Sequence, residues 1–183
     1  MKDSLSVGAL FVGLAMATTP LNAQVSPYTD LESREIKALS EEQVRGYLEG
    51  RGLSFALAGE LNSYPGPRHV IDMADDLELT REQLQRATEV FDEMQASAME
   101  LGEQYVSAER ELDELFAEQS IGDTRLAEVT RTLGRLRGEL RYVHLAAHLR
   151  MKEILSAHQV AMYDVLRGYG GGGEAGHQHN LDH

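Results

Sequence analysis

The chain contains no proline after Pro67, and this absence constrains its fold more than any other feature. Proline is the residue that most strongly interrupts a helix, so long helices are permitted over the rest of the chain. From Leu84 to Leu115, apolar and small residues recur in alternating steps of three and four, which is the pattern of a helix with one buried seam. A second seam of this kind runs from Leu126 to Ile154, with only Arg150 out of phase.

The two seams are separated by a short polar stretch, residues 119–123, in which Gly122 is a predicted helix stop and Asp123 a predicted N-cap. Two long helices joined by so short a loop fold back antiparallel. Residues 81–118 carry eleven acids and three arginines, whereas residues 123–153 carry four acids, six arginines and one lysine. The sequence therefore predicts an all-α fold built on a long antiparallel helical hairpin, with an acidic helix facing a basic one.

Shorter helices are expected on either side of this hairpin. The stretches at about 41–49, 53–62, 68–77 and 157–167 are separated by glycine and proline and have helical patterns. Gly102 and Gly138 are expected opposite each other within the hairpin. They either permit bending or the close approach of another helix, or they are tolerated at surface positions.

The two ends of the chain differ from its middle. Residues 1–23 have a lysine, a short apolar run and a small-residue region, the features of a cleavable signal peptide, with an uncleaved anchor as the alternative. We then expect a linker at 24–38, a helical domain at 39–167 and a flexible Gly/His tail at 168–183. This organisation predicts an exported, periplasmic protein.

Composition limits what such a protein can bind. The chain has no cysteine, so it can form neither disulfides nor thiolate metal sites. Its formal net charge of −13 disfavours nucleic acid and anionic membranes as partners, and it suits metal ions or cationic clients. The acidity is also explained by solubility alone.

One local motif occurs three times, at Leu39–Gln43, Leu79–Gln83 and Leu155–Gln159. Each copy is Leu, then Ser or Thr, then two variable residues, then Gln, which is the pattern of a capping box preceded by an apolar staple. The second copy opens the first long helix and the third follows the second long helix, so both belong to the open end of the hairpin.

This arrangement resembles the LTxxQ family of periplasmic proteins, with Spy, CpxP, ZraP and CnrX-like members, although the third copy has Ser in place of Thr. The resemblance implies a cradle-like helical homodimer that acts in envelope stress. It also implies one of two activities, an ATP-independent chaperone or a metal-responsive sensor or resistance protein. Fold transfers more safely than function between such relatives.

His144 and His148 lie four residues apart on the second long helix, the spacing at which a helix offers two imidazoles to one metal ion. We expect the pair to flank the seam. Counting back from the turn places Glu93, Ser97 and Glu100 at the same level of the first long helix, so Glu93 and Glu100 are predicted as further ligands. The alternative is an exposed pair of unrelated histidines.

Other histidines offer weaker candidate sites. His69 with Met73, and His158 with Met162, have the same spacing and would suit copper, although methionine at helical spacing more often fills a core. The tail offers three further candidate ligands, or is merely a polar end: His177, His179 and His183. The N-terminal histidine pair of CnrX-like relatives has no counterpart, because no histidine lies between Gln24 and Arg68.

No catalytic motif stands out, so we do not expect an enzyme. The leading hypothesis is a periplasmic metal-binding sensor or resistance protein that takes zinc, copper or nickel and does not need the metal to fold. The alternatives are a Spy-like chaperone for unfolded clients and an adaptor that docks on a membrane sensor protein.

Overall fold

The computed structural model describes residues 26–169, which divide into two compact units after Glu32. The described part of the first unit contains one 3-10 helix, η1 (Thr29–Leu31). The described part of the second unit contains six α-helices, and residues 26–169 contain no β-strand. The predicted all-α fold is therefore confirmed. Residues 1–25 and 170–183, which include the predicted signal peptide and the three tail histidines, lie outside the described residues.

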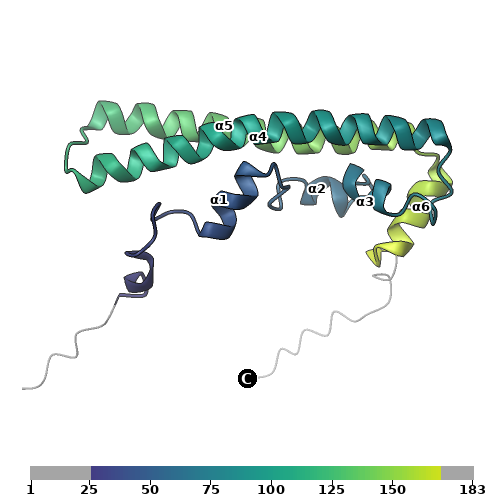
Figure 1. Cartoon of the computed structure of the whole chain (residues 1–183), viewed down its shortest axis with the longest axis horizontal. Coiled ribbons are helices and arrows are strands. Elements are labelled where there is room, and N and C mark those ends of the chain that lie inside the picture. Colours follow the sequence, from purple (N-terminus) through teal and green to yellow (C-terminus); the bar gives the residue numbers. More distant parts are fainter. Residues whose placement is uncertain (1–25, 170–183) are drawn as a thin grey trace, which may run out of the picture. The chain divides into compact units, whose positions relative to one another are not determined.

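The second unit is built on two long helices, α4 (Arg81–Ala117) and α5 (Asp123–Ile154), which pack side by side over their length (Figure 1). At 1.5 Å per residue they extend for about 55 Å and 48 Å. Their buried faces carry the predicted seam residues, among them Ala98 and Tyr105 of α4 and Leu136 and Leu140 of α5. The predicted antiparallel hairpin is thus present.

The turn of the hairpin differs in detail from the prediction. The residue with left-handed backbone after α4 is Gln119, with a φ of 54°, whereas Gly122 is extended and is itself the N-cap of α5. Asp123 is the first residue of the helix, where its carboxylate favours the positive end of the helix dipole. Both roles lie within a few residues of the predicted positions. The sequence locates the turn, but it does not determine the backbone geometry within the turn.

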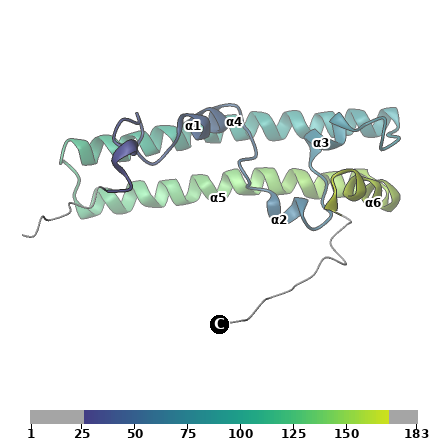
Figure 2. The same cartoon turned by 90° about the horizontal axis from the view of Figure 1, so that it is seen from below.

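Three short helices lie along one side of the hairpin (Figures 1 and 2). The first, α1 (Glu41–Leu48), packs on α4, α2 (Leu57–Glu60) packs on α5, and α3 (Pro67–Asp72) contacts both. The last helix, α6 (Ala157–Leu166), turns away at the open end. The long helices are therefore buried on two sides, against each other and beneath this series of short helices.

Gly102 of α4 explains how α1 can lie so close. A Cβ atom at Gly102 would overlap the carbonyl oxygen of Tyr47 in α1, so only glycine permits this approach. Around Gly138 and Gly134 of α5, by contrast, nothing lies within 4 Å of an added Cβ. Of the expected glycine pair, Gly102 therefore allows the close approach of another helix, and Gly138 does not.

The core consists of two apolar clusters along the hairpin. The first surrounds α1, where Ile36, within the predicted linker, is almost fully buried with Tyr47 and Leu140. The second lies at the open end and includes Val70, Leu77, Met151 and Tyr163. Between Leu140 and Met151, α5 buries two histidines, His144 and His148, in addition to Ala147.

Ion pairs also join the two long helices, as the charge pattern predicts. Glu93 of α4 pairs with Arg150 of α5, and Glu111 pairs with Arg125 near the turn. All four side chains are about half exposed or more, so these pairs set the orientation of the helices more than their stability. Within residues 26–169, no helix is both long and apolar enough to cross a membrane.

Candidate functional site

All three copies of the repeated motif form the predicted capping boxes. The hydroxyls of Ser40, Thr80 and Ser156 each accept the main-chain N–H of the motif glutamine three residues later. The glutamine side chain in turn accepts the N–H of the capping residue. The motif therefore begins α1, α4 and α6 in the same way.

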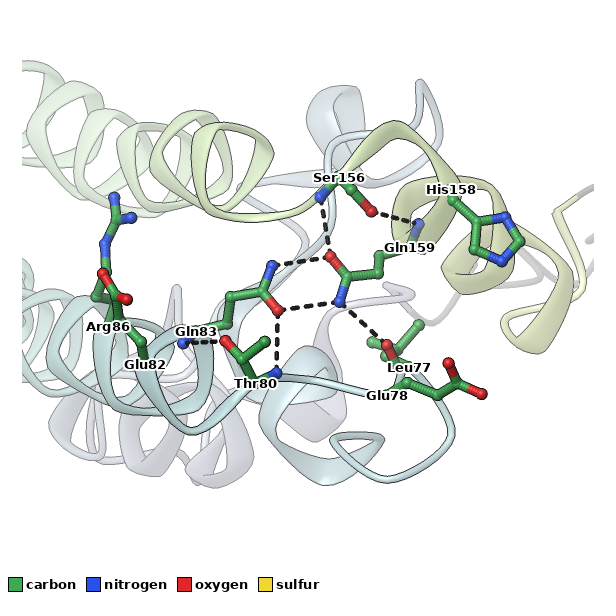
Figure 3. Close-up of a pocket in the computed structure, with 9 residues that line it drawn as sticks. All are labelled: Leu77, Glu78, Thr80, Glu82, Gln83, Arg86, Ser156, His158 and Gln159. Carbon is green, nitrogen blue, oxygen red and sulfur yellow. Dashed lines mark hydrogen bonds between the residues drawn. The ribbon is translucent and has the colours of Figure 1, made fainter.

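Two of these glutamines also bind each other at the open end of the hairpin (Figure 3). Gln83 Nε2 donates to Gln159 Oε1 at 2.9 Å, and Gln159 Nε2 donates back to Gln83 Oε1 at 3.0 Å. Each amide also donates to a main-chain carbonyl, that of Ile154 or that of Leu77. The second and third motif copies thus join the beginnings of α4 and α6, so the motif orients α6 relative to the hairpin.

A groove of about 680 Å³ lies between the short helices and the hairpin. Its walls come from the segment around α2, from α3, from α4 and α5, and from the end of the described chain at Arg167 and Tyr169. Three of the seven histidines line it: His69, His144 and His148. The groove therefore brings His69 close to a histidine pair that lies 75 or more residues further along the sequence.

His148 is 8 % exposed and has a defined tautomer. Its Nδ1 lies 2.7 Å from the carbonyl oxygen of Tyr64, which can only accept a hydrogen bond. Nδ1 therefore carries the proton, and the lone pair of the neutral ring is on Nε2. A carbonyl behind one ring nitrogen is the usual arrangement for a histidine that binds a metal ion through the other.

His144 is 3 % exposed, and its ring stacks on Phe55 with the centroids 5.9 Å apart. Its Nε2 is buried and has no hydrogen-bond partner, which is rare for a buried polar atom and marks a candidate site. Burial, and then the charge of His148, lower the pKa of His144 to about 4. The ring is therefore neutral at physiological pH, the state in which imidazole binds metals.

A buried carboxylate completes the polar part of the groove. Glu60 is 7 % exposed, and its Oε1 accepts hydrogen bonds from Tyr163 at 2.7 Å, Tyr169 at 2.9 Å and Arg167 at 3.2 Å. Its Oε2 lies 3.8 Å from His148 Nδ1. Burial alone would raise the pKa of Glu60, but the hydrogen bonds from Tyr163 and Tyr169 and the charges of His148 and Arg167 lower it. The carboxylate is therefore ionised.

The structure changes the environment that the sequence predicts for the histidine pair. His144 and His148 flank the seam, as predicted, but they are not exposed, because α5 buries a second face there: His148 lies against Gly59 of α2, and His144 lies against Phe55 just before α2. Glu93 and Glu100 do not meet them. Glu93 pairs with Arg150 at the surface, and Glu100 is exposed and does not line the groove.

The two weaker His and Met candidates lie in different parts of the structure. His69 lines the groove with the pair, whereas Met73 packs against the open-end apolar cluster. His158 and Met162 line a separate hollow beside α6 that includes none of the other histidines of the described residues. Among residues 26–169, no three His, Asp or Glu side chains converge closely enough to hold a metal ion. The groove thus offers a pair of imidazoles with polar neighbours and not a complete coordination shell.

Comparison with known proteins identifies no relative. No protein family, no curated protein and no solved structure matches the chain. The resemblance to the LTxxQ family therefore stays a prediction, carried by the three capping boxes and the hairpin.

Proposed function

We propose that this protein is a metal-responsive binding protein of the bacterial envelope, in which His144 and His148 hold a divalent transition metal inside the groove. The observation that carries the proposal is the hydrogen bonding of the two imidazole rings. The Nε2 atom of His144 is buried without a partner, and the tautomer of His148 leaves its Nε2 free to coordinate.

The groove contains donors that can extend this pair. Glu60 Oε2 lies on the His148 side, and His69 enters from α3. Nitrogen ligands with one carboxylate suit zinc, nickel and copper, whereas magnesium and calcium prefer oxygen alone. Because tight sites for these metals need at least three protein ligands, the groove has to close around the ion, or a second copy has to supply a ligand. A cradle-like homodimer is part of this proposal.

Metal-dependent thermal stability tests the proposal. A metal that binds the folded state preferentially raises the melting temperature in step with the logarithm of its free concentration. We expect zinc, nickel or copper to do so for the full chain above about pH 6, and less below it, where free imidazole becomes protonated. The double variant His144→Ala with His148→Ala should lose this stabilisation.

A tail deletion provides the matched control. Removing residues 170–183 should lower the number of metal ions bound, because three histidines are lost, and should leave the stabilisation in place. If the metal stabilises the double variant as much as the wild type, the histidine pair is not the site.

A second function is favoured by the surface of the hairpin. Tyr142 of α5 is 71 % exposed, and Leu149, two turns further along the same helix, is also exposed. Exposed apolar side chains on the basic helix of the hairpin suit a chaperone that holds unfolded clients. The test is whether the wild type suppresses aggregation of an unfolded client and whether Tyr142→Ser with Leu149→Ser loses that suppression. This result, together with an absence of stabilisation by metal, would favour the chaperone function over metal binding.

A further inference from the structure

The groove has the size and part of the lining of a site for a small organic molecule. Its volume of about 680 Å³ lies within the range of ligand pockets. Part of its wall is apolar, because Leu53 enters from the segment before α2, and Phe91 and Met94 enter from α4. All three side chains are only partly buried, so they offer apolar surface that a ligand can cover.

The groove also carries a local positive charge, although the chain as a whole is strongly acidic. Its lining contains three arginines and two carboxylates. Two of the arginines, Arg51 and Arg167, pair with the two carboxylates of the lining. The third, Arg68, pairs with Asp72, which lies outside the lining. A ligand group with a single negative charge would therefore complement the groove at Arg68.

Arg68 is well placed to bind such a group. Its side chain is 65 % exposed, and its pairing with Asp72 is at the surface, where an ion pair contributes little. Its guanidinium carbon lies 5.7 Å from the centre of the Phe91 ring. A guanidinium can donate two parallel hydrogen bonds to a carboxylate. The cation and the apolar wall are thus adjacent, which suits a carboxylate joined to an aromatic ring.

The buried part of the groove offers a hydrogen-bond acceptor. His148 is almost fully buried, its Nδ1 carries the proton that binds the carbonyl of Tyr64, and no described residue donates to its Nε2. In this tautomer Nε2 can only accept, so a ligand has to bring a donor such as a hydroxyl group. A Cβ atom added at Gly66 would lie 3.3 Å from Nε2. Since Arg68 follows Gly66 by two residues, its main chain lies within about 7 Å of Gly66.

We infer that the groove binds a small aromatic hydroxy acid. Its carboxylate would meet Arg68, its ring would lie against Phe91 and Met94, and its hydroxyl would donate to His148 Nε2. The inference goes beyond the proposed function, because this occupant needs no metal ion. A metal ion and the acid would both use His148 Nε2, so each would exclude the other.

Two acids that differ by one hydroxyl group test the contact with His148. Calorimetry with the full chain, in the presence of a chelator, would compare 4-hydroxycinnamate with cinnamate. We expect the hydroxyl to improve the affinity of the wild type about tenfold. His148→Asn keeps an N–H group at the position of Nδ1 and removes Nε2. The two acids should bind this variant equally, with cinnamate binding as it does to the wild type.

A second pair of variants tests the charge. Arg68→Gln should weaken the binding of both acids about tenfold and should leave the binding of the uncharged methyl ester of 4-hydroxycinnamate unchanged. Arg86→Gln is the matched control, because it removes an exposed arginine of α4 that does not line the groove. It should bind both acids as the wild type does.

The outcomes separate this inference from the proposed function, since no metal takes part in these measurements. If neither acid binds the wild type at millimolar concentration, the organic-acid site is overturned and the metal site is unaffected. Equal weakening by Arg68→Gln and Arg86→Gln overturns the site as well, because it shows nonspecific attraction of an anion. A hydroxyl group that adds as much affinity in His148→Asn as in the wild type overturns the contact with Nε2.

Discussion

Replacing His144 with leucine should remove a large part of the acid sensitivity of the fold. Burial lowers the pKa of His144 from 6.5 to about 4 in the folded chain, while the unfolded chain keeps an ordinary histidine. Between these values the unfolded state binds more protons than the folded state, so stability falls as the pH falls from about 6.5 towards 4. At about pH 5 this one ring is expected to cost the wild type about 2 kcal/mol relative to neutral pH.

The substitution itself should be well tolerated at neutral pH. The Nε2 atom of His144 has no hydrogen-bond partner, and the ring packs on Phe55, so an apolar side chain of similar size loses no hydrogen bond there. Urea unfolding followed by circular dichroism, in the presence of a chelator, measures the stability of both proteins at about pH 7.5 and about pH 5. Glu60 and the other carboxylates are present in both proteins, so the difference between the two proteins isolates His144.

His158→Leu is the matched control, because it removes a histidine that is exposed on α6. It should lose as much stability between the two pH values as the wild type does. If His144→Leu also loses as much as the wild type, His144 is not protected from protonation by the fold, and the description of the groove is wrong at that residue.

Two further substitutions test the packing of the fold. Gly102→Ala should destabilise the protein by about 2 kcal/mol, because its Cβ would overlap the Tyr47 carbonyl, whereas Gly138→Ala, with open space around it, should stabilise α5 by about 1 kcal/mol. If urea unfolding shows that both glycine substitutions change the free energy of unfolding equally, the close contact of α1 with α4 is refuted. In a double-mutant cycle, Gln83→Ala and Gln159→Ala should show a coupling free energy of about 1 kcal/mol or more, since each amide is the other's partner, and simple additivity would contradict the pairing.

The elements that could be predicted from sequence are those specified by neighbouring residues. The long seams predicted α4 and α5, and Ser or Thr followed by Gln at the third position predicted the starts of α1, α4 and α6. Periodicity and capping are local properties, and tertiary contacts here agree with them.

The site could be predicted only in part. The spacing of His144 and His148 identified the pair, but the seam of α5 was assigned to one partner helix, so the burial of this pair against α2 and Phe55 was not predicted. That helix is too short to show a period of its own. Glu60 was missed because its hydrogen-bond donors lie more than 100 residues away and no local pattern connects them.

Metal content is the most direct test of the central claim that His144 and His148 hold a transition metal in the groove. The untagged full chain and its double variant His144→Ala with His148→Ala would be purified under identical conditions, dialysed and examined by elemental analysis. Because a metal bound to the folded chain is retained through purification, the wild type should carry about one more zinc, copper or nickel ion per chain than the variant. Equal metal content in the two proteins would contradict the claim.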